Sequence, residues 1–393
     1  MNTPLKQLNI PLFGLGFRPF FLFGSLHSIL VMAVWVLVYT AVIPGFSGMN
    51  SIIWHIHEMV FGFAGAIIAG FILTASANWV GIRGLHGLKL FGLFFCWFIG
   101  RVVYFMVPFK LISMSWIVLD LLWMPLLILV LAPPLVRAGK WKNTGLLFIL
   151  LGLFICQVLL SFHLFGFNAE IFYEAGYVSP FFVILLIVIV GGRITPLFTR
   201  NKYGVEVIQH PVWEWSALLS FYLFMIILLV FGWGETAGWA ALIVAFCNLV
   251  RLSGWNGLVT WKDPLYWVMH LAYFFIPLGF TILWLSLSFN LFSRSIANHV
   301  FNTGVIGLFI LGMITRVSKG HTGRPIQSDS FIVTAYFLLL GSVIFRTLIP
   351  YLFPHWGLNA VVVSGITWIL AFSIFLIRFS GMLFTVRPDG RPG

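Results

Sequence analysis

Four histidines are candidate ligands for a metal or a cofactor, because the hydropathy pattern places them all near one membrane face. His55 and His57 begin an apolar run, His163 ends another and His299 begins a third. Imidazole nitrogens bind haem iron and copper. The equal depth of these side chains therefore favours a cofactor site, and the alternative is that they are interfacial side chains in contact with water.

The densest cluster is the string Trp54-His55-Ile56-His57-Glu58-Met59. On an α-helix, His55 lies beside Met59 and near Glu58, whereas His57 points about 200° away from His55. One turn therefore presents two ligand faces. An axial histidine needs an acceptor that orients its second nitrogen, and Glu58 could be such an acceptor for a neighbouring helix.

Arg101 and Asp120 lie at matching depths in adjacent apolar runs. A charge inside a membrane costs about 3 kcal/mol on insertion scales. We therefore predict that these two side chains form a buried ion pair. Such a pair could form part of a proton or anion path. The alternative is a purely structural role, in which the two side chains neutralise each other's charge inside the membrane.

The elements that must position these residues are membrane-spanning helices. Of the 393 residues, 61% are hydrophobic and only 8% are charged, against about 25% charged in soluble domains, which excludes a soluble protein. Runs of nearly uncharged residues recur along the chain, each long enough to cross a bilayer as a helix. We predict one all-α, polytopic transmembrane domain over residues 1–393 with about twelve helices.

The predicted spans end at charges, prolines and glycines. They are residues 20–43, 56–79, 88–108, 112–132, 145–165, 178–198, 213–233, 237–256, 264–287, 297–317, 329–349 and 357–379. Loops after even-numbered spans carry basic residues such as Arg83, Lys140 and Lys319, whereas Glu170 and Glu235 lie on the other side. This asymmetry predicts cytoplasmic termini, and it explains the net charge of +12 without nucleic acid.

A weak internal repeat has a period near 120 residues. Gly192-Arg193-Ile194-Thr195 resembles Gly312-Met313-Ile314-Thr315, and Gly70-Phe71-Ile72-Leu73-Thr74 closes an earlier span. The repeat predicts that spans two, six and ten are equivalent in four-helix units 1–137, 138–258 and 259–393. Glycine and threonine are common at helix ends, so chance similarity is the alternative.

Four longer strings together resemble the NnrS family. They are Pro11-Leu-Phe-Gly-Leu-Gly-Phe-Arg-Pro-Phe20, Trp54-His-Ile-His-Glu-Met-Val-Phe-Gly-Phe63, Gly191-Gly-Arg-Ile-Thr-Pro196 and Thr315-Arg-Val-Ser-Lys-Gly-His-Thr-Gly-Arg-Pro325. The resemblance extends over nearly the whole chain. It implies a bacterial inner-membrane protein that binds haem and copper and protects the cell against nitric oxide and nitrosative stress.

The chain is also distantly similar to the catalytic subunit of haem-copper oxidases, in which histidines of helices two and ten bind a haem. This similarity implies that His57 and His299 bind haem b near the periplasmic face, and without a CxxCH motif the haem is non-covalent. The copper-binding histidine expected on helix six is absent. Copper, if bound, is therefore expected on His55, Met59 or His163.

The resemblance leaves the reaction open, so whether the protein is an enzyme is not decided. The expected partners are the lipid bilayer and nitric oxide or a related small molecule. A different class is a metal-free transporter or exporter of a small solute, in which discontinuous helices line the route. Span six could be broken at Gly191-Gly192 and Thr195-Pro196. The alternative is that these residues mark the end of the span.

Overall fold

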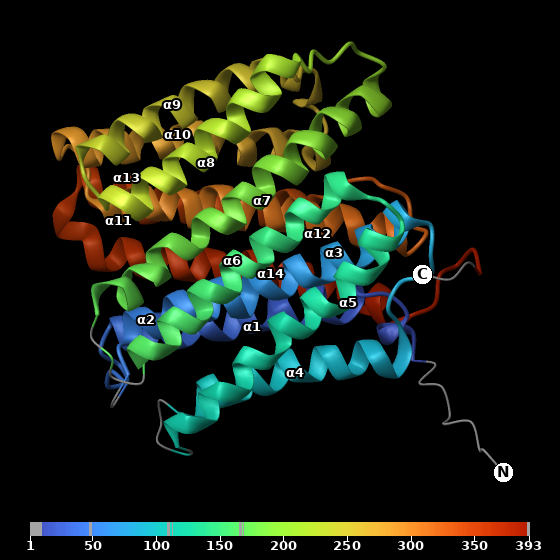
Figure 1. Ribbon diagram of the computed structural model, residues 1–393, viewed down its shortest axis with the longest axis horizontal. Helices are drawn as coiled ribbons and strands as arrows, with labels where there is room; N and C mark the ends of the chain where they lie inside the picture. Colours follow the sequence, from blue (N-terminus) through green and yellow to red (C-terminus); the bar gives the residue numbers. More distant parts are fainter. Residues whose placement is uncertain are drawn as a thin grey trace. The chain divides into compact units, whose positions relative to one another are not determined.

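The computed structural model describes residues 10–46, 49–107, 111, 113–164, 167 and 169–390. Every regular element in these residues is helical, which confirms the all-α class. Twelve stretches are long and apolar enough to cross a membrane, as predicted, and the described chain is therefore a multi-pass membrane protein (Figure 1).

The spans are formed by fourteen α-helices, because spans two and ten each contain two. In chain order they are α1 (Phe17–Tyr39), α2 (Ser51–His57), α3 (Gly65–Val80), α4 (Gly87–Met106), α5 (Trp123–Arg137), α6 (Trp141–Leu164), α7 (Glu170–Tyr203), α8 (Pro211–Phe231), α9 (Glu235–Ser253), α10 (Pro264–Phe289), α11 (Arg294–His299), α12 (Leu308–His321), α13 (Ser330–Leu352) and α14 (Gly357–Phe384). Two 3-10 helices adjoin them: η1 (Pro11–Phe13) precedes α1, and η3 (Met114–Leu122) leads into α5.

Span six is longer than predicted and is unbroken. α7 continues from Glu170 to Tyr203, so the predicted end or break around Gly191 and Pro196 is wrong. The helix passes through both positions, and the discontinuity that would have favoured a transporter is absent from α7.

Polar side chains determine where several spans begin. Asn50, Asp263, Ser293 and Asp329 precede α2, α10, α11 and α13, and their side-chain oxygens accept hydrogen bonds from backbone N–H groups of the first turn. These groups would otherwise have no intrahelical partner. The caps therefore fix the first turn of both spans that carry the candidate haem ligands His57 and His299.

Spans two and ten each change helical type immediately after a histidine. α2 ends at His57 and continues as the π-helix η2 (Glu58–Ala64), and α11 ends at His299 and continues as the π-helix η5 (Val300–Gly307). π-Helices are rare and frequently occur at functional sites. Both spans therefore combine a candidate ligand with an unusual backbone.

The same residue spacing surrounds both π-helices. Each span contains a histidine followed by glycines five, eight and thirteen positions later: His57, Gly62, Gly65 and Gly70 in span two, and His299, Gly304, Gly307 and Gly312 in span ten. The matching backbone and spacing identify spans two and ten as a local repeat. The division into three four-helix units stays a prediction.

The repeated glycines meet equivalent neighbours. A Cβ added at Gly65 would lie 3.0 Å from the ring of Trp123, and one added at Gly307 would lie 2.6 Å from the ring of Trp368. These tryptophans belong to spans four and twelve, which occupy the same place in the first and last groups of four spans. The absence of a side chain at Gly65 and Gly307 therefore leaves space for a tryptophan ring at the same position of each repeat.

The chain forms two compact units. Unit 1 contains Met1–Phe182, Ile314–Ile326 and Phe372–Gly393, and unit 2 contains Val183–Met313 and Gln327–Ala371. In unit 2, α9 packs against both α8 and α10 (Figure 1). In unit 1, α3 and η2 pack against α1, and this contact positions the candidate site.

Arg18 connects the first and last spans of unit 1. Its side chain is fully buried, and Nη1 donates hydrogen bonds to the carbonyl oxygens of Met382, Leu383 and Thr385 at 3.2, 2.9 and 2.8 Å. Cations interact favourably with unpaired carbonyls at the C-terminal end of a helix. The start of α1 is therefore joined to the end of α14.

Gly70→Ala should destabilise the protein by about 1–3 kcal/mol, because its new Cβ would lie 2.9 Å from the Phe20 Cβ and 3.2 Å from the Phe17 backbone. The matched control is Gly92→Ala in α4, where the new methyl meets nothing within 4 Å and stability should rise by up to about 1 kcal/mol. Thermal unfolding of the purified protein in detergent, followed by circular dichroism, measures both. Equal shifts for the two variants would contradict the close packing at Gly70.

Candidate functional site

A network of ionisable side chains lies inside unit 1. It contains His27 from α1, His57 and Glu58 from the junction of α2 and η2, Arg101 from α4 and Asp120 from η3. Each of these residues is at most 5% exposed. The network is therefore removed from water, and each charge depends on neighbouring side chains for its stability.

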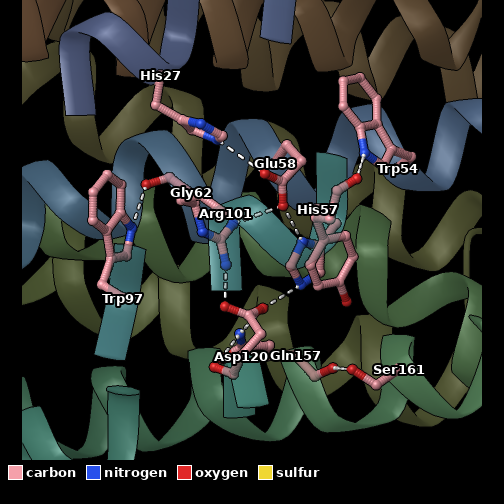
Figure 2. Close-up of polar contacts among 11 residues, drawn as sticks. His27, Trp54, His57, Glu58, Gly62, Trp97, Arg101, Asp120, Gln157 and Ser161 are labelled. Carbon is pink, nitrogen blue, oxygen red and sulfur yellow. Dashed lines mark hydrogen bonds and ion pairs between the residues drawn. The ribbon is translucent and has the colours of Figure 1, made fainter. Parts of the chain in front are cut away.

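Four of these side chains form a closed ring (Figure 2). Glu58 Oε1 accepts a hydrogen bond from Arg101 Nη1 at 2.6 Å and lies 2.8 Å from His57 Nδ1. Arg101 Nη2 donates to Asp120 Oδ1, and Asp120 Oδ2 lies 3.1 Å from His57 Nε2. Each carboxylate thus lies between the guanidinium and the imidazole.

Two further polar side chains contact the outer oxygens of the ring. His27 Nε2 lies 3.0 Å from Glu58 Oε2, and Gln157 Nε2 donates to Asp120 Oδ2 at 2.8 Å. Figure 2 shows both pointing at the carboxylates from outside the ring. Each of the four carboxylate oxygens therefore lies close to a nitrogen of another side chain, and the contact between Glu58 Oε2 and His27 is an ion-pair contact without a hydrogen bond.

Gly62 gives the network the space that it occupies. A Cβ at this position would lie 2.5 Å from His27 Nε2 and 2.7 Å from Arg101 Nη1. Its carbonyl oxygen accepts a hydrogen bond from Trp97 Nε1 at 3.0 Å. The first glycine of the repeated spacing therefore brings the backbone of η2 directly against the charged side chains.

The imidazole of His57 lies between the two carboxylates. Its Nδ1 lies 2.8 Å from Glu58 Oε1, and its Nε2 lies 3.1 Å from Asp120 Oδ2. Tyr104 stacks on the imidazole of His57 with a centroid separation of 3.8 Å. The phenol ring therefore covers one face of the His57 side chain.

Span ten provides an internal comparison for the network. Its repeat has Val300 directly after the histidine, where span two has Glu58, and Phe275 lies against Gly304 where His27 lies against Gly62. The same π-helix and glycine contacts therefore form without these two polar residues. Glu58 and His27 are therefore not required for the π-helix itself.

The structure brings half of the predicted site residues together. Those in the network are His57, Glu58, Arg101 and Asp120, and the predicted Arg101–Asp120 ion pair is present. Sequence reasoning missed the parts played by His27 and Gln157. Each of them is a polar residue inside an otherwise apolar helix. That pattern marks the position as unusual, but it does not indicate which side chain of another helix it contacts.

The proposed copper ligands lie outside the network. His55 stacks on Trp35 with ring centroids 4.4 Å apart, and the edge of the His163 ring meets Tyr173 at 5.5 Å. Met59 is half-buried. Among the described residues, no group of three or more His, Cys, Asp or Glu side chains is arranged to hold a metal ion, so copper binding stays a prediction.

His57 does not fit the role of an axial haem ligand in this arrangement. An iron atom bound to Nε2 would occupy the space next to Asp120, and one bound to Nδ1 would displace Glu58. His299 belongs to unit 2, where its Nδ1 donates to the Ser295 carbonyl oxygen at 2.7 Å. Such a bond commonly orients a metal-binding histidine, so His299 fits the role better than His57.

The Arg101–Asp120 pair gives a direct test of the network. Arg101→Met should destabilise the protein by about 3–5 kcal/mol, because it leaves two buried carboxylates with too little positive charge. Adding Asp120→Asn should recover about 0.5–3 kcal/mol relative to the sum of the single changes, since only one of the two buried carboxylates then remains without the guanidinium. Detergent unfolding curves measure the four proteins of the cycle.

The control for this cycle is Arg137→Gln on the exposed end of α5, which should change stability by less than about 0.5 kcal/mol. Strict additivity of Arg101→Met and Asp120→Asn would show that the two side chains do not interact energetically.

Comparison with known proteins gives one informative result. The family model described as NnrS protein matches residues 11–387, which include all membrane spans and the whole charged network. Comparison with curated proteins gives no match. The chain therefore belongs to the NnrS family, the membrane proteins of the nitric oxide response.

Proposed function

We propose that this protein protects bacteria against nitric oxide at the inner membrane and that the charged network of unit 1 is the centre of this activity. The observation that carries the proposal is the closed ring of Glu58, Arg101, Asp120 and His57, which is buried in the spans. Ionisable groups at membrane depth are costly and usually functional.

The location of the network suits a small uncharged substrate. Nitric oxide carries no charge and dissolves in hydrocarbon, so it reaches the membrane interior without a polar channel. Inside unit 1 it would meet an environment with fixed charges. Preorganised charges in a dry site stabilise developing charge more strongly than water does, and this is the chemical contribution that the network can make.

Haem b and copper remain part of the proposal as cofactors of the periplasmic side. A bound haem would supply an iron atom that takes nitric oxide as a ligand. His299 is the best-supported ligand on this chain because of the bond to Ser295. His57 would become available only after its contacts with Glu58 and Asp120 had opened, and His55, Met59 and His163 remain the copper candidates.

Growth under nitric oxide tests the role of the network. In a strain that lacks the chromosomal copy, Glu58→Gln and Asp120→Asn should abolish most of the protection that the wild-type protein restores, because each change removes one charge from the ring. Glu235→Gln, at the exposed start of α9, is the matched control and should protect fully. Full protection by both network variants, at equal protein levels in the membrane, would refute the proposal.

Optical spectra and metal analysis of the purified protein test the cofactors separately. We expect a Soret band whose reduced peaks shift with nitric oxide, and we expect His299→Ala to lose haem. His57→Ala should retain haem if the imidazole serves only the ring. A spectrum that is unchanged in both variants would exclude both histidines as ligands, and a featureless spectrum of a folded, metal-supplied preparation would exclude haem.

A further inference from the structure

Unit 1 contains a large cavity that is separate from the charged network. Its volume is about 1300 Å³, above the range of about 300–1,000 Å³ that is usual for pockets of drug-sized ligands. Part of its wall is apolar and includes Ile82 and Leu88, which are exposed, and Val130 and Pro134 from α5, which are half-buried. The cavity therefore offers room and an apolar surface for a ligand larger than a simple ion.

The remaining wall is basic. Five lining residues carry cationic or imidazole side chains: Arg83, His86, Lys89, His321 and Arg387. None of the lining residues is acidic. Arg387 is paired with Asp389, whereas Arg83 and Lys89 are exposed and have no ion-pair partner in the part of the chain that the structure describes. Their positive charge is therefore available to a ligand.

The start of α4 adds backbone donors to the same wall. His86 precedes the helix without capping it, because its Nδ1 donates instead to the Gly84 carbonyl oxygen at 2.7 Å. The first three residues of the helix, Gly87, Leu88 and Lys89, all line the cavity. Uncapped N–H groups at a helix start favour an anion, and phosphate is a common one.

We propose that this cavity binds a phospholipid with an anionic headgroup. Its phosphate would lie at the start of α4 between Arg83 and Lys89, and its acyl chains would lie along Val130 and Pro134 of α5. The charge pattern favours an anion, and the apolar wall favours one with a hydrocarbon part. Basic pockets between membrane-spanning helices on the cytoplasmic side commonly bind acidic lipids, and the loop that carries Arg83 is predicted to be cytoplasmic.

This lipid site is independent of the proposed role in nitric oxide defence. It uses no residue of the network, and its test does not require activity. Native mass spectrometry of protein purified in mild detergent should detect a retained anionic phospholipid. Delipidated protein should then melt at a higher temperature in phosphatidylcholine vesicles that contain phosphatidylglycerol than in pure phosphatidylcholine vesicles.

The variant Arg83→Gln/Lys89→Gln tests the assigned residues. Each basic side chain near the headgroup accounts for about a fivefold change in affinity, so the double variant should bind about thirtyfold more weakly and lose the stabilisation. Arg137→Gln/Lys140→Gln removes two exposed charges that do not line the cavity, and it should bind like the wild type. All four side chains are exposed, so both variants should fold, which circular dichroism verifies.

Two results would overturn the proposal. The first is equal lipid retention and equal stabilisation in both double variants, which would mean that the vesicle effect does not arise at this cavity. The second is that inorganic phosphate stabilises the delipidated protein as strongly as phosphatidylglycerol vesicles do, since the site would then recognise a soluble anion and not a lipid.

Discussion

A charge that leaves water for the interior of a membrane protein must be neutralised by another charge, and this constraint determines the interior of unit 1. Glu58 and Asp120 cannot remain there alone, because the cost of desolvation is several kcal/mol per ion. Arg101 and His57 each contact both carboxylates. The residues that make the site chemically unusual are therefore also the residues that hold α2, α4 and η3 together.

The sequence could predict the spans and one contact of the network. Hydropathy locates the spans because an uncharged stretch of this length has few alternatives. The Arg101–Asp120 pair was predictable from depth, since each charge lies in an apolar run. The contact between His57 and Glu58 was not, because adjacent residues of a helix point in different directions, and the conformations of their two side chains bring them together. The roles of His27 and Gln157 depend on contacts between helices, which hydropathy does not encode.

The two π-helices show how one backbone design is used with different side chains. In span two the first repeated glycine admits imidazole and guanidinium groups, whereas in span ten it admits the ring of Phe275. This relation is weak at the level of sequence, because few residues besides the histidine and the glycines are common to both copies. Spans two and ten share the π-helix and the close packing at the glycines, although most of their side chains differ. Span ten therefore indicates which features of span two belong to the scaffold.

The bond between Arg18 and the end of α14 has a consequence for the order of assembly. Translation proceeds from the N-terminus, so Arg18 is made near the beginning, and its acceptors at Met382, Leu383 and Thr385 are made near the end. Unit 1 likewise needs Phe372–Gly393. The guanidinium of the first span therefore has no access to these acceptors until the last span has been made. Final closure of this unit thus waits for α14.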